Sequence, residues 1–209
     1  RDMVHDSFIA INGAEVTAVN VLTRLLRLSQ LTGGFLHEDG SERPVPVSDA
    51  KQTAVADIVD SAAQDGKKLV IIARFLPEIA AITRMLEKKA IGYSLISGEI
   101  RDRDEQVQRF QTDPDVTVFV GQIATAGMGI TLTAADTMVF YSLDYSMSNF
   151  EQTKARIHRV GQRNPCTYVY LVASGTVDEK VLKALRDKAD LARVLIDDYR
   201  AGKNPFQNN

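Results

Sequence analysis

From about residue 48 onward, short runs of β-branched and other apolar residues alternate with segments of helical length. Five of these runs are predicted strands, at residues 68–73, 93–97, 116–120, 137–143 and 167–173. Such alternation is typical of βαβ units, whose strands are parallel and whose crossovers carry helices. Because the crossovers are right-handed, the sequence predicts an α/β fold with a mostly parallel sheet and helices on both faces.

The segments between and before the strands complete this plan. Helices are predicted at residues 77–90, 103–111, 148–160 and 177–195, and ahead of the sheet at 16–31 and 49–63, with a loop at 33–47 between them. The chain therefore divides into a helical lead-in with its loop (1–48), one α/β domain (49–200) and a flexible tail (201–209).

Composition excludes several classes of protein. The 25 Lys and Arg residues face 27 Asp and Glu residues, so no overall basic field attracts nucleic acid and any contact with a polyanion is local. No apolar run approaches the roughly 18 residues that span a bilayer, and the chain lacks a targeting pattern at its start. Cys166 is the one cysteine, which excludes an internal disulfide and a multi-cysteine zinc site.

The segment after the fourth predicted strand concentrates candidate functional residues. Ser148 and Glu151 fit a capping box, which sets the predicted start of the helix. On that helix Gln152, Arg156 and Arg159 share one stripe, and a second stripe suits packing on the sheet: Phe150, Thr153, Ile157 and Val160. Two guanidinium groups one turn apart repel each other unless an anion lies between them. A solvated basic face is the alternative interpretation.

Two other segments follow strands at the edge where open α/β sheets bind ligands. In residues 124–132, Gly127 and Gly129 allow close approach of the backbone to a phosphate or ribose, with N–H groups expected at the start of a helix. Ser97 and Gly98 could likewise present backbone donors to phosphates. Tight packing of a helix on the sheet explains the two glycines equally well, and a plain turn is the better interpretation of Ser97 and Gly98 taken alone.

Other chemistries lack support. No Gly-x-x-x-x-Gly-Lys-Ser/Thr loop is present, so nothing in the sequence cradles the β- and γ-phosphates of a nucleotide. Asp178 is predicted to interact with the dipole of the helix that it begins, in preference to a metal. The three histidines are far apart in sequence, and no metal site is expected.

In combination, these motifs resemble the Snf2 family of superfamily 2 helicases. The run from Gln152 to Gln162 resembles motif VI, residues 127–136 resemble motif V, and residues 68–75 resemble motif IV. Gly175 to Glu179 matches the sequence that follows the last strand in this family. The resemblance covers about residues 20–195. The sequence departs from the family pattern at residues 122–124, 145–147 and 155, which argues against a nucleosome role, and the departure at 122–124 resembles the compact phage-like or annealing-helicase branch.

The resemblance implies the C-terminal of two RecA-like lobes, the one without a phosphate loop. ATP and Mg would then be bound mainly by an absent first lobe, to which this chain supplies the arginine fingers Arg156 and Arg159, with Gln152 assisting. Gly127 and Gly129 would contact nucleotide, while Ser97, Gly98 and Thr125 would contact double-stranded DNA. The whole would be a cytoplasmic, phage-encoded or nucleoid-associated translocase without membrane partners.

Two alternatives remain open. The chain could be a non-catalytic lobe that docks on DNA or on a partner protein. It could also be a complete nucleotide-binding domain, which the missing phosphate loop disfavours.

Overall fold

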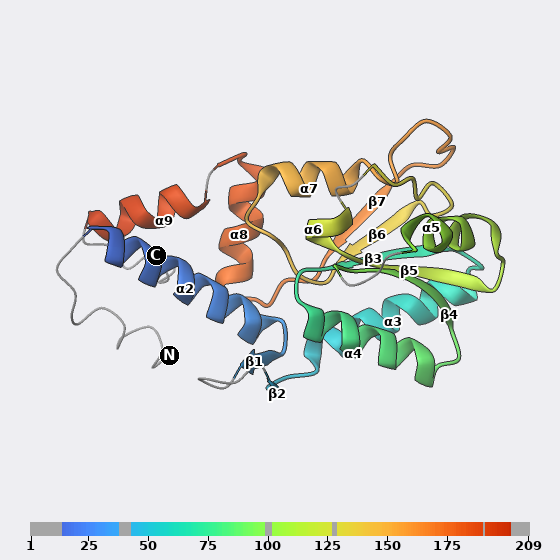
Figure 1. Cartoon of the computed structure of the whole chain (residues 1–209), viewed down its shortest axis with the longest axis horizontal. Coiled ribbons are helices and arrows are strands. Elements are labelled where there is room, and N and C mark those ends of the chain that lie inside the picture. The colour runs from blue at the N-terminus through green and yellow to red at the C-terminus, as the bar shows by residue number, and fades with distance from the viewer. Residues whose placement is uncertain (1–13, 38–42, 99–101, 127–128, 190, 202–209) are drawn as a thin grey trace.

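A computed structural model describes residues 14–37, 43–98, 102–126, 129–189 and 191–201, built around one five-stranded sheet (Figure 1). The strands lie in the order β4-β5-β3-β6-β7, and every neighbouring pair is parallel. Their bounds are Leu69–Ala73 for β3, Gly92–Ile96 for β4, Val116–Gln122 for β5, Thr137–Phe140 for β6 and Thr167–Tyr170 for β7. The five predicted strands and the parallel α/β fold are therefore confirmed.

Helices cover both faces of this sheet, as Figure 1 shows. α3 (Ala50–Gln64) and α4 (Leu76–Lys88) pack on one face, with Leu69, Ile71 and Ala73 of β3. Val70 and Ile72 point the other way, because successive side chains of a strand alternate between faces. There they meet α5 (Arg103–Thr112), α7 (Met147–Lys154), α8 (Val177–Arg186) and α9 (Leu191–Arg200). All five residues of β3 are buried, as expected for a central parallel strand.

The lead-in packs with the helices on the second face of the sheet, the face of α5, α7, α8 and α9. Its helix, α2 (Ala14–Thr32), contacts α8 and α9 and adds Val21 and Leu25 to their apolar cluster. The predicted loop at 33–47 instead contains a small antiparallel pair, β1 (Phe35–His37) and β2 (Pro44–Pro46). Phe35 is 5% exposed and packs edge to face on Phe75, so burial of one aromatic ring explains the ordered pair.

The predicted helix at 177–195 is two helices. α8 ends at Arg186, Lys188 adopts a left-handed backbone with φ of 53°, and α9 begins at Leu191. The break lets both helices bury apolar residues, Leu185 from α8 and Leu195 from α9, in the same cluster. Helical periodicity continued through the break, and for that reason the sequence predicted one helix.

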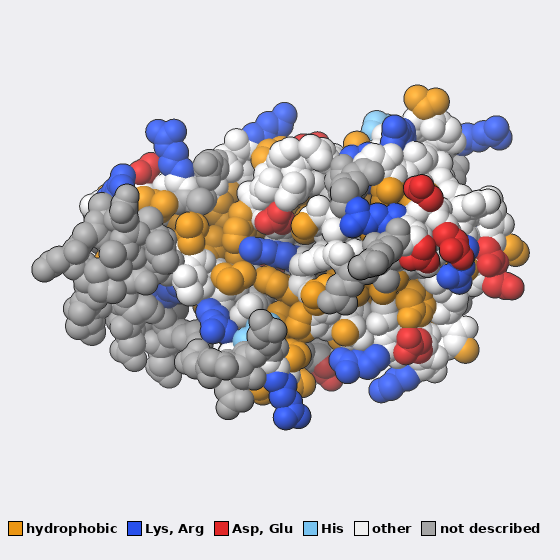
Figure 2. Space-filling model, in the orientation of Figure 1, with side chains coloured by type: hydrophobic (Ala, Val, Ile, Leu, Met, Phe, Trp, Pro, Cys, Tyr) orange, Lys and Arg blue, Asp and Glu red, His pale blue; other side chains and the backbone are white. Residues whose placement is uncertain are grey.

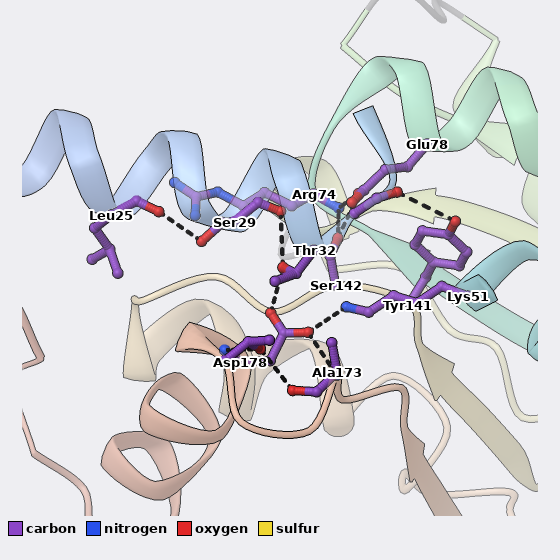
Figure 3. A network of polar contacts seen from close by, with 12 residues as sticks. Leu25, Ser29, Thr32, Lys51, Arg74, Glu78, Tyr141, Ser142, Ala173 and Asp178 are labelled. Carbon is purple, nitrogen blue, oxygen red and sulfur yellow. Dashed lines mark hydrogen bonds and ion pairs between the residues drawn. The ribbon is translucent and has the colours of Figure 1, made fainter. Parts of the chain in front are cut away.

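Buried polar contacts tie the lead-in to the sheet domain (Figure 3). The carboxylate of Asp178, in the first turn of α8, accepts hydrogen bonds from Thr32 Oγ1 at 2.7 Å, Lys51 Nζ at 2.6 Å and Ala173 N at 3.1 Å. These partners come from α2, α3 and the segment after β7. Asp178 does lie in the first turn of its helix, and it also joins three other parts of the fold.

Candidate functional site at the carboxyl edge of the sheet

The ends of β3, β4 and β5 are joined by one side chain, Gln122. Its Oε1 accepts from Gly98 N at 3.1 Å, and its Nε2 donates to Arg74 O at 3.3 Å. Ser97 is only 5% exposed, whereas Gly98 is exposed, so a ligand at this edge meets backbone and not the serine hydroxyl. Sequence reasoning noted Gln122 only as a departure from the family pattern. Its bonding partners lie 24 and 48 positions away, which no local pattern reveals.

Arg74 begins the segment after β3 and lies among aromatic rings. Its guanidinium carbon is 3.9 Å from the ring centre of Tyr145 and 4.9 Å from that of Phe75, and its Nε is 4.0 Å from Asp144 Oδ1. Cation–π contacts of this kind stabilise a partly desolvated arginine. A positive charge therefore lies at the carboxyl end of the central strand, at a residue that the sequence analysis had not singled out as a site residue.

The glycine segment after β5 differs from its prediction. A short helix, α6 (Ile123–Ala126), precedes the glycines and none follows directly, so the expected helix start at Gly129 is wrong. Thr125 is 9% exposed and donates its hydroxyl to Gln122 O at 2.9 Å. Gly127 lies outside the described residues. Gly129 is exposed, and its φ of 71° is the reason a glycine suits this position.

The helix that carries motif VI is also shorter than predicted. α7 starts at Met147, capped by Ser146, whose hydroxyl accepts from Asn149 N at 3.2 Å, so the predicted capping box from Ser148 is wrong. It ends at Lys154, and the residues that follow form turns. The carbonyl of Arg156 accepts from Leu132 N at 2.9 Å, a contact with another segment that replaces helical bonding.

Residues 155–161, which we call the arginine loop, contain both candidate arginine fingers. Arg156 is half-buried; burial lowers its pKa, and the nearby charge of Arg159 lowers that pKa further. Arg159 is exposed and donates through Nη1 to Gly129 O at 3.0 Å and Ile130 O at 3.4 Å. Although no helical stripe aligns them, the fold still brings two positive charges close together.

The remaining residues of the segment that resembles motif VI are of two kinds, buried side chains and exposed ones. Of the predicted apolar stripe, Phe150, Thr153 and Ile157 are buried, but Val160 is 98% exposed at the far end of the arginine loop. Gln152 is exposed and donates to Ser148 Oγ at 3.0 Å.

Gln162, which follows the arginine loop, fixes that loop to neighbouring backbone. Its Nε2 donates to Ala135 O at 2.7 Å and Ile157 O at 3.3 Å, while its Oε1 accepts from the next two backbone N–H groups, those of Arg163 and Asn164.

A buried acid lies beside Arg74 (Figure 3). Glu78 is 1% exposed, and its Oε2 accepts from Arg74 N at 3.2 Å, Phe75 N at 3.1 Å and Ser142 Oγ at 2.5 Å. Burial raises the pKa of Glu78 to about 7, although these bonds and nearby Lys51 oppose the shift. A hollow of about 590 Å³ adjoins Glu78, between the β1–β2 pair, α3 and α4, and its lining contains none of the predicted site residues.

Charge is unevenly distributed over the surface. Figure 2 shows Asp and Glu side chains gathered at the end of the molecule near α5, with Lys and Arg side chains scattered over the rest of that face. Within the described ranges, no group of three or more His, Cys, Asp or Glu side chains could hold a metal ion. The described helices include none that is both long and apolar enough to cross a membrane.

Comparison with known proteins agrees with this architecture. Residues 50–161 match the helicase conserved C-terminal domain. The chain is 30% identical over 198 residues to the chromatin-remodeling ATPase INO80 of Cryptococcus neoformans var. neoformans serotype D (strain B-3501A), covering 92% of this chain and 11% of that protein. The chain thus spans about a tenth of the length of such a relative.

Two solved structures from Sulfolobus solfataricus share the fold. The SWI2/SNF2 ATPase core domain has a TM-score of 0.68 at 24% identity, covering 94% of this chain and 39% of that one. The SWI2/SNF2 ATPase C-terminal domain has a TM-score of 0.65 at 21% identity, covering 92% of this chain and 78% of that one. With more than half of its length matched to the family, the chain belongs to the helicase conserved C-terminal domain family, as the C-terminal RecA-like lobe of a Snf2-type superfamily 2 protein.

Proposed function

We propose that this chain is the second motor lobe of a DNA-dependent ATPase that translocates on double-stranded DNA. In this proposal ATP and Mg bind between this lobe and a first lobe of the same protein, which contributes the phosphate loop and the magnesium ligands. Bound ATP would supply the γ-phosphate that reacts. This chain would supply positively charged side chains and hold them where they can reach that phosphate. Arg156 and Arg159 are the residues that carry these side chains.

One observation carries the proposal: hydrogen bonds to neighbouring backbone hold two guanidinium groups close together. Leu132 N donates to Arg156 O, and Arg159 Nη1 donates to Gly129 O, so the arginine loop is fixed to the segment between β5 and β6. Burial and the nearby charge of Arg159 both lower the pKa of Arg156, in that order of size, as expected for two like charges held close together. A phosphate between them relieves this repulsion, and the planar forks of arginine match its oxygens.

The carboxyl end of β4 offers a separate surface to a nucleic-acid backbone. Gly98 presents a backbone N–H that is now bonded to Gln122 Oε1, and a DNA phosphate would compete with that oxygen. Ser97 contributes backbone alone, because its side chain is buried. Thr125 and Gln152 stay candidates in the roles predicted from the resemblance, and Gly129 stays a candidate for nucleotide contact.

The test of the finger assignment is Arg159→Lys in the complete protein. Lysine keeps the charge but loses the fork, and we expect the DNA-stimulated rate of ATP hydrolysis to fall about 100-fold or more. Arg193→Lys, on the exposed face of α9, is the matched control and should leave the rate unchanged. Normal turnover by Arg159→Lys would show that the assignment is wrong.

A second experiment tests the shared site. The isolated chain, mixed with ATP, Mg and duplex DNA, should hydrolyse essentially no ATP. DNA-stimulated turnover by the isolated chain that disappears on Arg156→Ala would contradict the half-site. If the complete protein binds DNA but never hydrolyses ATP, the non-catalytic docking lobe is the better interpretation.

A further inference from the structure

The backbone of residues 129–135, which we call the linking segment, is bonded on one side to the arginine loop and its flank. Leu132 N donates to Arg156 O at 2.9 Å, Arg159 Nη1 donates to Gly129 O at 3.0 Å, and Gln162 Nε2 donates to Ala135 O at 2.7 Å. The position of both arginines therefore depends on the position of this segment.

A single side chain, Gln111 in the last turn of α5, bonds the linking segment from its other side. Its Nε2 donates to Thr131 O at 3.0 Å and to Thr133 Oγ1 at 3.4 Å, and its Oε1 accepts from Ala134 N at 2.8 Å. An amide is suited to this task because it donates and accepts at once. Without it, the partly buried Thr131 O and the exposed Ala134 N both lose the partner that links them to α5.

The helix that carries Gln111 packs on β4 and β5. Phe110, the residue before it, is fully buried and packs edge to face on Phe119 at 5.4 Å. Near the start of the same helix, Gln106 Oε1 accepts from Leu95 N at 3.2 Å. β4 ends immediately before Ser97 and Gly98, so α5 and the proposed DNA contact lie on the same unit. A displacement at one end of this unit reaches Gln111 at the other.

We propose that Gln111 is a positioning residue that couples DNA contact at the end of β4 to the placement of Arg156 and Arg159. This inference rests on the proposed function and names a residue through which DNA stimulates hydrolysis. Gln111 touches neither ligand and acts through the linking segment. The physical connection runs from Gly98 through β4 and α5 to Gln111, and from the linking segment to the arginine loop.

The experiment compares ATP hydrolysis by the complete protein with and without duplex DNA. Gln111→Ala should reduce the ratio of DNA-stimulated to basal rate about tenfold, a typical size for coupling between sites. Gln111→Glu should reduce it at least as much, because a carboxylate still accepts from Ala134 N but repels Thr131 O. The matched control is Gln108→Ala, an exposed glutamine three positions earlier on α5, which should keep the wild-type ratio.

A second variant, in the linking segment, tests the same contact in case Gln111→Ala fails to fold. Thr133→Val removes the hydroxyl that accepts from Gln111 and keeps the side-chain shape, so the ratio should fall about threefold. Melting temperatures of all variants are measured in parallel. A folded Gln111→Ala protein with the wild-type ratio, or one whose basal and stimulated rates fall by the same factor, would overturn the inference.

The design separates this inference from the proposed function. If the wild-type protein is not stimulated by DNA, or if Arg156→Ala keeps its turnover, the proposed function fails and the coupling role fails with it. If both of those expectations hold and Gln111→Ala behaves like Gln108→Ala, only the role of Gln111 is wrong.

Discussion

Two groups of charged residues in this molecule are arranged on opposite principles. In the network around Asp178, opposite charges meet: Lys51 Nζ lies 2.6 Å from the carboxylate, with side chains 9% and 13% exposed. In the arginine loop, two like charges are brought close, and contacts to the linking segment help to fix them: Leu132 N donates to Arg156 O, and Arg159 Nη1 donates to Gly129 O.

This difference is the one we expect between a site that stabilises the fold and the ligand site that we propose. Groups that complement each other inside the chain stabilise the fold and leave nothing for a partner to satisfy. In the proposed function, two like charges fixed close together gain further stabilisation from the phosphate of a bound nucleotide. The contrast predicts that substitutions in the network change stability, whereas substitutions in the arginine loop change activity.

The largest effect on stability is expected for Lys51→Ala, which breaks the buried pair. Removing one partner leaves Asp178 buried without its counter-charge, so the free energy of unfolding should fall by about 4 kcal/mol. Urea denaturation of the chain measures this. Lys89→Ala is the matched control, because Lys89 lies 2.7 Å from Asp60 with side chains 33% and 47% exposed, and should lose less than about 1 kcal/mol. Equal losses would break the comparison.

Glu78→Gln tests the second acid of the buried region through pH. The pKa of Glu78 is raised from 4.5 to about 7, so the folded state prefers the protonated form. The free energy of unfolding that Glu78 contributes is therefore fully present below pH 4.5 and is lost as the pH rises through about 7. Glutamine does not titrate.

Between pH 4.5 and pH 9, the free energy of unfolding of the variant should therefore rise relative to that of the wild type. The expected rise is on the order of 3 kcal/mol, the energy that corresponds to the shift in pKa. Urea titrations of both proteins at several pH values measure the difference. Parallel pH profiles for the two proteins would show that Glu78 is not the titrating group, since the other groups around it, Lys51 and Tyr141, are present in both.

The smallest effect is expected for Val160→Ser in the arginine loop. Because this side chain is 98% exposed, the free energy of unfolding should change by less than about 0.5 kcal/mol. The same change at Val139, which is fully buried in β6, should cost more than about 2 kcal/mol. A large loss at Val160 would mean that the loop is part of the core.

The fold was predictable where local pattern and burial coincide. The five strands are apolar runs whose residues pack on both faces, and the bounded length of each run distinguishes it from the helices between them. The arginine pair was predictable from the resemblance of residues 152–162 to motif VI. The end of the helix before Arg156 was not predictable. Where the chain leaves the helix, Leu132 N bonds Arg156 O, and these residues lie 24 positions apart in the sequence.

Other details depend on tertiary partners that a single sequence does not specify. Ser146 and Ser148 are both acceptable caps, and the placement of Asn149 decides for Ser146. Gln111 and Gln122 look like ordinary polar residues at the ends of secondary structure. Only the fold shows that each amide joins segments 20 or more positions away.

The central claim is that Arg156 serves a site completed by another lobe. Its most direct test is Arg156→Ala in the complete protein, with DNA-stimulated ATP hydrolysis and the melting temperature measured on the same preparation. We predict a rate reduced by at least about 10³-fold, as for loss of an arginine finger, and a melting temperature within a few degrees of wild type. Wild-type turnover, or a loss of turnover explained by unfolding, would contradict it.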